Sequence, residues 1–270
     1  MSTGSWRRIG EGDPRRTVLA VDFDSTARPE AGFRRLAPLL PAGREIWLTG
    51  QPDAAERQLL DAEAYLGWWR ERPEGARGHV DTVMGYCVGG VFASALADEI
   101  GRQQGTRPAL LLFDPEPVEA MSLYRDLRKA VGAMTVLSEE ERTGYVTEAL
   151  TVCEALTASE NVDDFRATAL QVVKVYESAA GLAFDRLGLD EETADDLMGM
   201  FRSYLSYLSA ARELSPEEGW ATALALTSAR SSPGAPLALR ERSFPLGTEE
   251  LLDSQDVAQA VHRFLEERGA

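Results

Sequence analysis

Histidine, cysteine and lysine are scarce in this chain of 270 residues, where they occur only as His79 and His262, Cys87 and Cys153, and Lys129 and Lys174. Two cysteines are too few for a disulfide framework, so we expect a cytoplasmic protein. The sequence also lacks an apolar run long enough to cross a bilayer. Its first residues lack the apolar core of a signal peptide, so neither membrane insertion nor secretion is expected.

Positive charge is also in short supply, with 28 lysines and arginines against 44 acids and a net charge of −16. Nucleic-acid binding requires neutralisation of phosphates, so this balance argues against a nucleic-acid partner. No spacing of cysteine, histidine or carboxylate typical of a metal site is found, and no glycine-rich phosphate loop. We therefore expect no metal and no cofactor.

What the chain does contain is the motif Gly85-Tyr86-Cys87-Val88-Gly89-Gly90. An apolar run at 79–84 predicts a strand before it, and residues 91–100 predict a helix after it. Strand, G-x-C-x-G and helix is the arrangement of the nucleophile elbow of α/β-hydrolases, with cysteine where serine is usual. The helix N-terminus would favour a thiolate there. The alternative is a glycine-rich turn carrying a buried structural cysteine.

The remaining pattern predicts a sheet interrupted by helices. β-branched and apolar runs predict strands at 17–23, 45–48 and 109–113, and helical segments alternate with them. This alternation is typical of a parallel α/β sheet. From 117 to 214 only helical spacing is found, and strand patterns return at 220–227 and 236–239 before a terminal helix.

We therefore predict an α/β-hydrolase fold, a mostly parallel sheet with a large helical lid insertion. The expected organisation is a flexible N-terminal tail at 1–16, a core at 17–116 and 215–270, and the helical lid at 117–214.

This order of elements resembles the thioesterase domains and stand-alone thioesterases of polyketide and nonribosomal peptide synthesis. The resemblance covers most of the chain beyond residue 16, and rests on Phe33–Ala37, the elbow with its helix, Leu111–Asp114 and the terminal helix Val257–Leu265. The elbow G-Y-C-x-G-G also resembles dienelactone hydrolases and polyhydroxyalkanoate synthases, which carry a cysteine nucleophile. The layout as a whole favours a thioesterase-like protein.

The resemblance implies a nucleophile at Cys87 and a catalytic acid at Asp114, directly after the strand that follows the elbow. An aspartate that only caps a turn would explain Asp114 as well. The oxyanion donors would be the backbone N–H of Val88 and that of Asp24 or Ser25. The hydroxyl of Ser25 could also donate, although a turn serine explains it equally.

The histidine that the resemblance implies is absent from its expected loop, 243–250. His79 begins the elbow strand, at the opposite end from the site, and His262 lies within the terminal helix, so no complete Cys-His-Asp triad can be assigned. Glu249 or Glu250 could replace the base only if it were drawn into an apolar pocket.

Three hypotheses about function follow. The first is a thioesterase-like acyltransferase or editing enzyme of natural-product biosynthesis. It would form acyl-Cys87 from an acyl or peptidyl carrier protein or a coenzyme A thioester, because a thiol can react without a base better than a hydroxyl can. The second is a non-catalytic relative that binds an acyl chain or a carrier protein. The third is a hydrolase or lyase of the same fold with a rearranged site.

Overall fold

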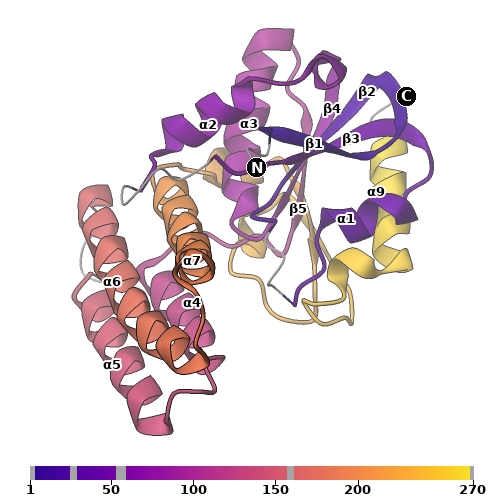
Figure 1. Cartoon of the computed structure of the whole chain (residues 1–270). Coiled ribbons are helices and arrows are strands. Elements are labelled where there is room, and N and C mark those ends of the chain that lie inside the picture. Colours follow the sequence, from indigo (N-terminus) through magenta and orange to yellow (C-terminus); the bar gives the residue numbers. More distant parts are fainter. Residues whose placement is uncertain (1–3, 25–28, 53–58, 157–160, 268–270) are drawn as a thin grey trace. The chain divides into compact units, whose positions relative to one another are not determined.

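A seven-stranded sheet forms the centre of the first of two compact units (Figure 1). The computed structural model describes residues 4–24, 29–52, 59–156 and 161–267. The strand order is β1-β3-β2-β4-β5-β6-β7, and all neighbours are parallel except β1 and β3. The strands are β1 (Trp6–Gly10), β2 (Gly12–Val21), β3 (Gly43–Thr49), β4 (Val80–Tyr86), β5 (Ala109–Phe113), β6 (Leu224–Thr227) and β7 (Arg240–Ser243). The predicted mostly parallel sheet is confirmed.

Helices cover both faces of this sheet, because successive side chains of a buried strand point to opposite faces. On one face, Phe113 of β5 meets Phe33 with ring centroids 5.4 Å apart. There α1 (Phe33–Leu36) and α9 (Gln255–Glu267) share one core with the sheet. On the other face lies α3 (Gly89–Gln104), whose Phe92 ring is 5.2 Å from that of Trp69 in α2 (Ala62–Arg70).

The N-terminal residues correct one prediction. Within the predicted flexible tail at 1–16, residues 6–10 form β1 and residues 12–16 form the first half of β2. Trp6 is buried and its indole N–H donates to the carbonyl of Trp69 at 2.8 Å. The sequence pattern does not predict the edge strand β1, because Arg7 and Arg8 interrupt its apolar residues and its pairing with β3 is made by backbone groups.

The strands after the helical insertion are shorter than the sequence pattern predicts. Residues 217–220 form a short helix, α8 (Glu217–Trp220), and only Leu224–Thr227 of the predicted strand at 220–227 joins the sheet. The strand predicted at 236–239 is wrong. A 3₁₀ turn occupies Ala235–Leu237, and the edge strand β7 follows it. All four residues of β7 are exposed, so no apolar pattern marks it.

The second unit is built from α4 (Ala120–Gly132), α5 (Glu139–Leu156), α6 (Val162–Leu187) and α7 (Glu191–Arg212). Of the described residues, it comprises 118–156 and 161–213 together with 59–62. The latter segment joins these helices through hydrogen bonds from the Leu60 amide to Ser206 Oγ (2.8 Å) and from the Ala62 amide to Glu213 (3.0 Å). None of the described helices is long and apolar enough to cross a membrane. A lid role for this unit stays a prediction.

Candidate active site

Cys87 lies in the turn between β4 and α3, at the edge of the sheet where the parallel strands end. Its backbone has φ of 52°, in the left-handed region that a cysteine rarely adopts. The Cys87 amide donates to the carbonyl of Phe113 (2.8 Å), and its own carbonyl accepts from the Gly90 amide (3.0 Å). This is a sharp and strained strand-to-helix turn, in which the thiol is half-buried at a helix N-terminus.

Close backbone packing requires glycine at positions 85 and 89, two residues before and two residues after Cys87. A β-carbon at position 89 would lie 2.3 Å from the carbonyl oxygen of Val21 in β2. A β-carbon at position 85 would lie 2.5 Å from the Cα of Gly90. Both distances are far below van der Waals contact, so any side chain at either position would displace the backbone.

The predicted oxyanion donors are partly placed. Val88 directly follows the thiol, and its N–H is among the first amides of α3, which have no carbonyl partner within the helix. The side chain of Asp24 accepts from Arg34 at 2.6 Å. Ser25 lies outside the described residues. The assignment of an oxyanion hole to Val88 and Asp24 or Ser25 stays a prediction.

Asp114 follows β5 on the same edge of the sheet and also has a left-handed backbone, with φ of 41°. Its Oδ1 accepts from the Ser228 amide at 2.8 Å, whereas Oδ2 is buried and has no hydrogen-bond partner among the described residues. Burial raises the pKa of Asp114 above its ordinary value, and the hydrogen bonds from Ser228 and the charge of Arg230 oppose that rise. One oxygen of the carboxyl group is thus fixed by a hydrogen bond, while the other lacks a hydrogen-bond donor among the described residues.

Replacing Asp114 with asparagine should stabilise the protein at neutral pH. Because the pKa of Asp114 is raised in the folded chain, the native state binds this proton more tightly than the unfolded state does. The stability that protonated Asp114 contributes is therefore lost as pH rises through the folded pKa. Asparagine keeps an acceptor for Ser228 and tolerates positive φ. We expect Asp114→Asn to raise Tm by a few degrees at about pH 7.5, with the gain vanishing near about pH 3. An equal Tm difference at both pH values would contradict this assignment.

Neither histidine lies at this edge of the sheet. His79 is exposed and immediately precedes β4, with Nε2 4.0 Å from Asp81 Oδ1. Cys87 follows the other end of that strand, so the strand separates them by about 25 Å. A strand-length separation rules out proton transfer between them.

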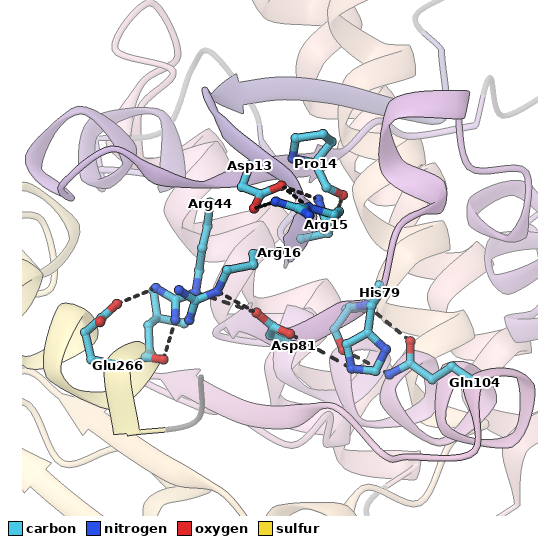
Figure 2. A network of polar contacts seen from close by, with 12 residues as sticks. Asp13, Pro14, Arg15, Arg16, Arg44, His79, Asp81, Gln104 and Glu266 are labelled. Carbon is cyan, nitrogen blue, oxygen red and sulfur yellow. Dashed lines mark hydrogen bonds and ion pairs between the residues drawn. The ribbon is translucent and has the colours of Figure 1, made fainter. Parts of the chain in front are cut away.

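His262 lies in α9, close to Glu266. Glu266 accepts from Arg44 at 2.8 Å and belongs to a polar network at the same opposite edge (Figure 2). Arg44 lies near the start of β3 and also approaches Asp81 at 3.7 Å. Both histidines therefore lie near the amino ends of the strands, at the opposite side of the sheet from Cys87. Neither of them can serve as the catalytic histidine.

Glu116 is the acid that approaches the thiol. Its Oε2 lies 3.8 Å from Cys87 Sγ, and its amide donates to the Cys87 carbonyl at 3.4 Å. The sequence analysis above does not predict a role for Glu116. The available signal was a second carboxylate two residues after Asp114, in the loop that leaves the carboxyl end of a central strand.

Glu249 and Glu250 do not meet the condition set for a replacement base. Both side chains are exposed, and no apolar pocket encloses them. Glu250 accepts from the Gly247 amide at 3.0 Å, and the backbone carbonyl of Glu249 accepts from Ala31 at 3.1 Å. They stabilise the turn in which they lie. Elsewhere in the described part of the chain, no group of three His, Cys, Asp or Glu could hold a metal ion.

The two thiols should differ sharply in reactivity. Cys153 is fully buried in α5, and burial raises its pKa to about 11, so almost no thiolate forms at neutral pH. Cys87 is half-buried at a helix N-terminus. We expect iodoacetamide to modify one thiol per folded chain and both after denaturation, with Cys87→Ala removing the fast reaction. Equal labelling of both cysteines in the folded protein would contradict this expectation.

Comparison with known proteins establishes the fold. No protein-family model matches the sequence, and no curated protein matches it. The chain is similar to the Vlm2 thioesterase domain bound with a dodecadepsipeptide, at 16% identity over 96% of each chain and a TM-score of 0.53. It is also similar to holo-AB3403, a four-domain nonribosomal peptide synthetase, at 15% identity over 98% of this chain and 20% of that one, with a TM-score of 0.57.

A third similar structure is that of an enzyme that is not described as a thioesterase. The meta-cleavage product hydrolase CumD of Pseudomonas fluorescens is 12% identical over 97% of this chain and 93% of its own, with a TM-score of 0.51. At such identities the likeness concerns the fold, because one fold carries many activities. The chain has the α/β-hydrolase fold. Its structural neighbours include a thioesterase domain, as the sequence resemblance implies.

Proposed function

We propose that this protein is a thioesterase-like acyltransferase or editing enzyme that forms an acyl-Cys87 intermediate from a carrier-protein or coenzyme A thioester. The observation that carries the proposal is the strained backbone of Cys87, held by close packing of Gly85 and Gly89 at the end of the central strand. Such strain is typical of functional positions rather than of structural cysteines.

The choice of a thiol fits the absence of a histidine. A serine hydroxyl without a base is almost wholly protonated and inert at neutral pH, whereas a cysteine with a pKa near ~8.5 supplies some thiolate. Exchange of an acyl group between two thiols is also nearly balanced in free energy. A thioester is therefore the acyl donor that suits this site.

The same reasoning places transfer ahead of hydrolysis. Water must lose a proton to attack an acyl-enzyme, and in triad hydrolases an imidazole accepts that proton. Here both histidines lie around the opposite edge of the sheet. An acceptor more nucleophilic than water is thus favoured to release the acyl group.

The structural neighbours support a tethered substrate. One is a thioesterase domain bound with a depsipeptide, and another is a four-domain nonribosomal peptide synthetase. By analogy, the acyl donor of this protein would be a carrier-protein or coenzyme A thioester. The pathway would be the biosynthesis of a nonribosomal peptide or a polyketide.

Intact mass spectrometry tests this proposal. After incubation with a series of acyl-coenzyme A thioesters, the protein should gain one acyl mass, and Cys87→Ala should gain none. A carrier protein loaded with the same acyl groups provides the tethered form of the donor. No adduct from any thioester, together with measurable carrier binding, would favour a non-catalytic binding protein. No adduct together with turnover of a non-thioester ester would favour a hydrolase or lyase with a rearranged site.

A further inference from the structure

The contact between Cys87 and Glu116 has a consequence for proton transfer. We propose that Glu116 is the proton acceptor and donor for Cys87, the role that a histidine has in a Cys-His-Asp triad. This inference rests on the proposed acyl transfer and names the group that would serve it. It takes the place of the replacement base predicted at Glu249 or Glu250, both of which are exposed.

Geometry supports the assignment. Oε2 of Glu116 lies 3.8 Å from Cys87 Sγ, within reach of a hydrogen bond in which the thiol donates. Both residues are half-buried, so the pair is partly shielded from water. Of the acids discussed above, Glu116 is the one whose carboxylate contacts the nucleophile.

The loop that carries Glu116 is fixed at each of its three residues. The Asp114 amide donates to the Leu226 carbonyl at 3.1 Å. The Pro115 carbonyl accepts from the Gly234 amide at 2.9 Å and from the Ser232 hydroxyl. The Glu116 amide then donates to Cys87 itself. The left-handed backbone of Asp114 helps to turn the chain, so that the second acid returns towards the elbow.

The protons balance in both half-reactions. In the first, Sγ attacks the thioester carbonyl carbon and its proton passes to Glu116 Oε2. The bond between that carbon and the leaving sulfur breaks, and Glu116 returns the proton to the released thiolate, which leaves as a thiol. In the second, an acceptor amine or thiol attacks acyl-Cys87, Glu116 takes the acceptor's proton, the carbon–Sγ bond breaks, and Cys87 recovers a proton from Glu116.

A carboxylate in this role restricts the acceptor. Its pKa is normally near ~4.3, about two units below that of an imidazole, so it is a weaker base for activating water. Thiols and amines need less help than water because they are stronger nucleophiles. The acceptor class that fits Cys87 with Glu116 is therefore a thiol or an amine, and hydrolysis should be the slow side reaction.

Glu116→Gln tests the assignment through two reactions of the same thiol. Acylation of Cys87 by an acyl-coenzyme A thioester, followed by intact mass in a single turnover, should slow by at least about 100-fold, because glutamine cannot return a proton to the leaving thiolate. Alkylation by iodoacetamide needs only the thiolate, and removing a neighbouring negative charge favours the thiolate. Alkylation at neutral pH should therefore stay unchanged or become faster. A purely structural role would slow both reactions together.

Controls make the result decisive. Glu249→Gln removes an exposed acid that does not contact the thiol and should leave both rates unchanged. Glu116→Asp retains the carboxylate with a shorter reach and should recover part of the acylation rate. If Glu116→Gln acylates at the wild-type rate, or loses alkylation in parallel with acylation, the role of Glu116 is overturned while acyl transfer stands. If the wild-type protein forms no adduct, the proposed function fails and the role of Glu116 falls with it.

Discussion

Replacing Cys87 with serine should reduce acyl transfer by about 1,000-fold, a loss in the middle of the range that a general base contributes. Serine and cysteine are nearly isosteric, so the elbow should keep its shape. The hydroxyl, however, needs a strong base to attack, and both histidines of the chain lie at the opposite edge of the sheet. In a protein with an intact triad, serine would be the ordinary nucleophile.

Single-turnover acylation followed by intact mass measures this effect. Cys153→Ala serves as the matched control, since it removes the buried thiol and should leave the acylation rate unchanged. The Tm of Cys87→Ser should equal that of the wild-type protein, which separates loss of chemistry from loss of folding. A serine variant that acylates within a few-fold of wild type would show that a strong base serves position 87 after all.

The second large effect concerns stability. Gly89→Ala should destabilise the fold by about 3 kcal/mol, the upper end of the usual cost of overpacking. The added methyl group would lie 2.3 Å from the carbonyl oxygen of Val21, a backbone atom that cannot rotate away. The expected fall in Tm is about 6 to 12 °C for a chain of this size.

Gly67→Ala is the matched control in the same unit. Gly67 lies within α2, where an added β-carbon would have 3.9 Å to its nearest neighbour outside the helix backbone. Alanine should therefore stabilise that helix by up to about 1 kcal/mol. Thermal unfolding followed by circular dichroism distinguishes the two variants. A small or absent effect of Gly89→Ala would mean that the elbow is more loosely packed than its geometry indicates.

Strands with a continuous apolar pattern could be predicted from the sequence, and strands held by backbone pairing alone could not. Ala109–Phe113 is uninterrupted and apolar, and β5 has those bounds. By contrast, β7 consists of Arg240–Ser243, all exposed, and is defined by its pairing with β6. Trp6–Gly10 is unpredictable for the same reason, because an edge strand depends more on backbone pairing with its neighbour than on an apolar face.

The candidate site shows a similar division. The motif around Cys87 predicted a strand, a tight turn and a helix, because local packing requires glycine at specific positions. Glu116 could not be predicted in the same way, since it lies 29 residues after Cys87 and meets it only through the pairing of β4 with β5. The absence of a histidine near the thiol was predictable, because both histidines have neighbours in sequence that fix their place in the sheet or helix.

The fixed loop after β5 also bears on how the site moves. Two amides of this loop, those of Asp114 and Glu116, donate hydrogen bonds to residues outside it. Two amides from outside, those of Ser228 and Gly234, donate hydrogen bonds to the loop. Hydrogen exchange at these amides requires those bonds to open, and most of their partners lie in or next to the central strands. In exchange experiments the loop should therefore behave as part of the sheet rather than as a surface connection. A loop that opens only with the sheet keeps the carboxylate beside the thiol before any substrate arrives, so the alignment needs no induced fit.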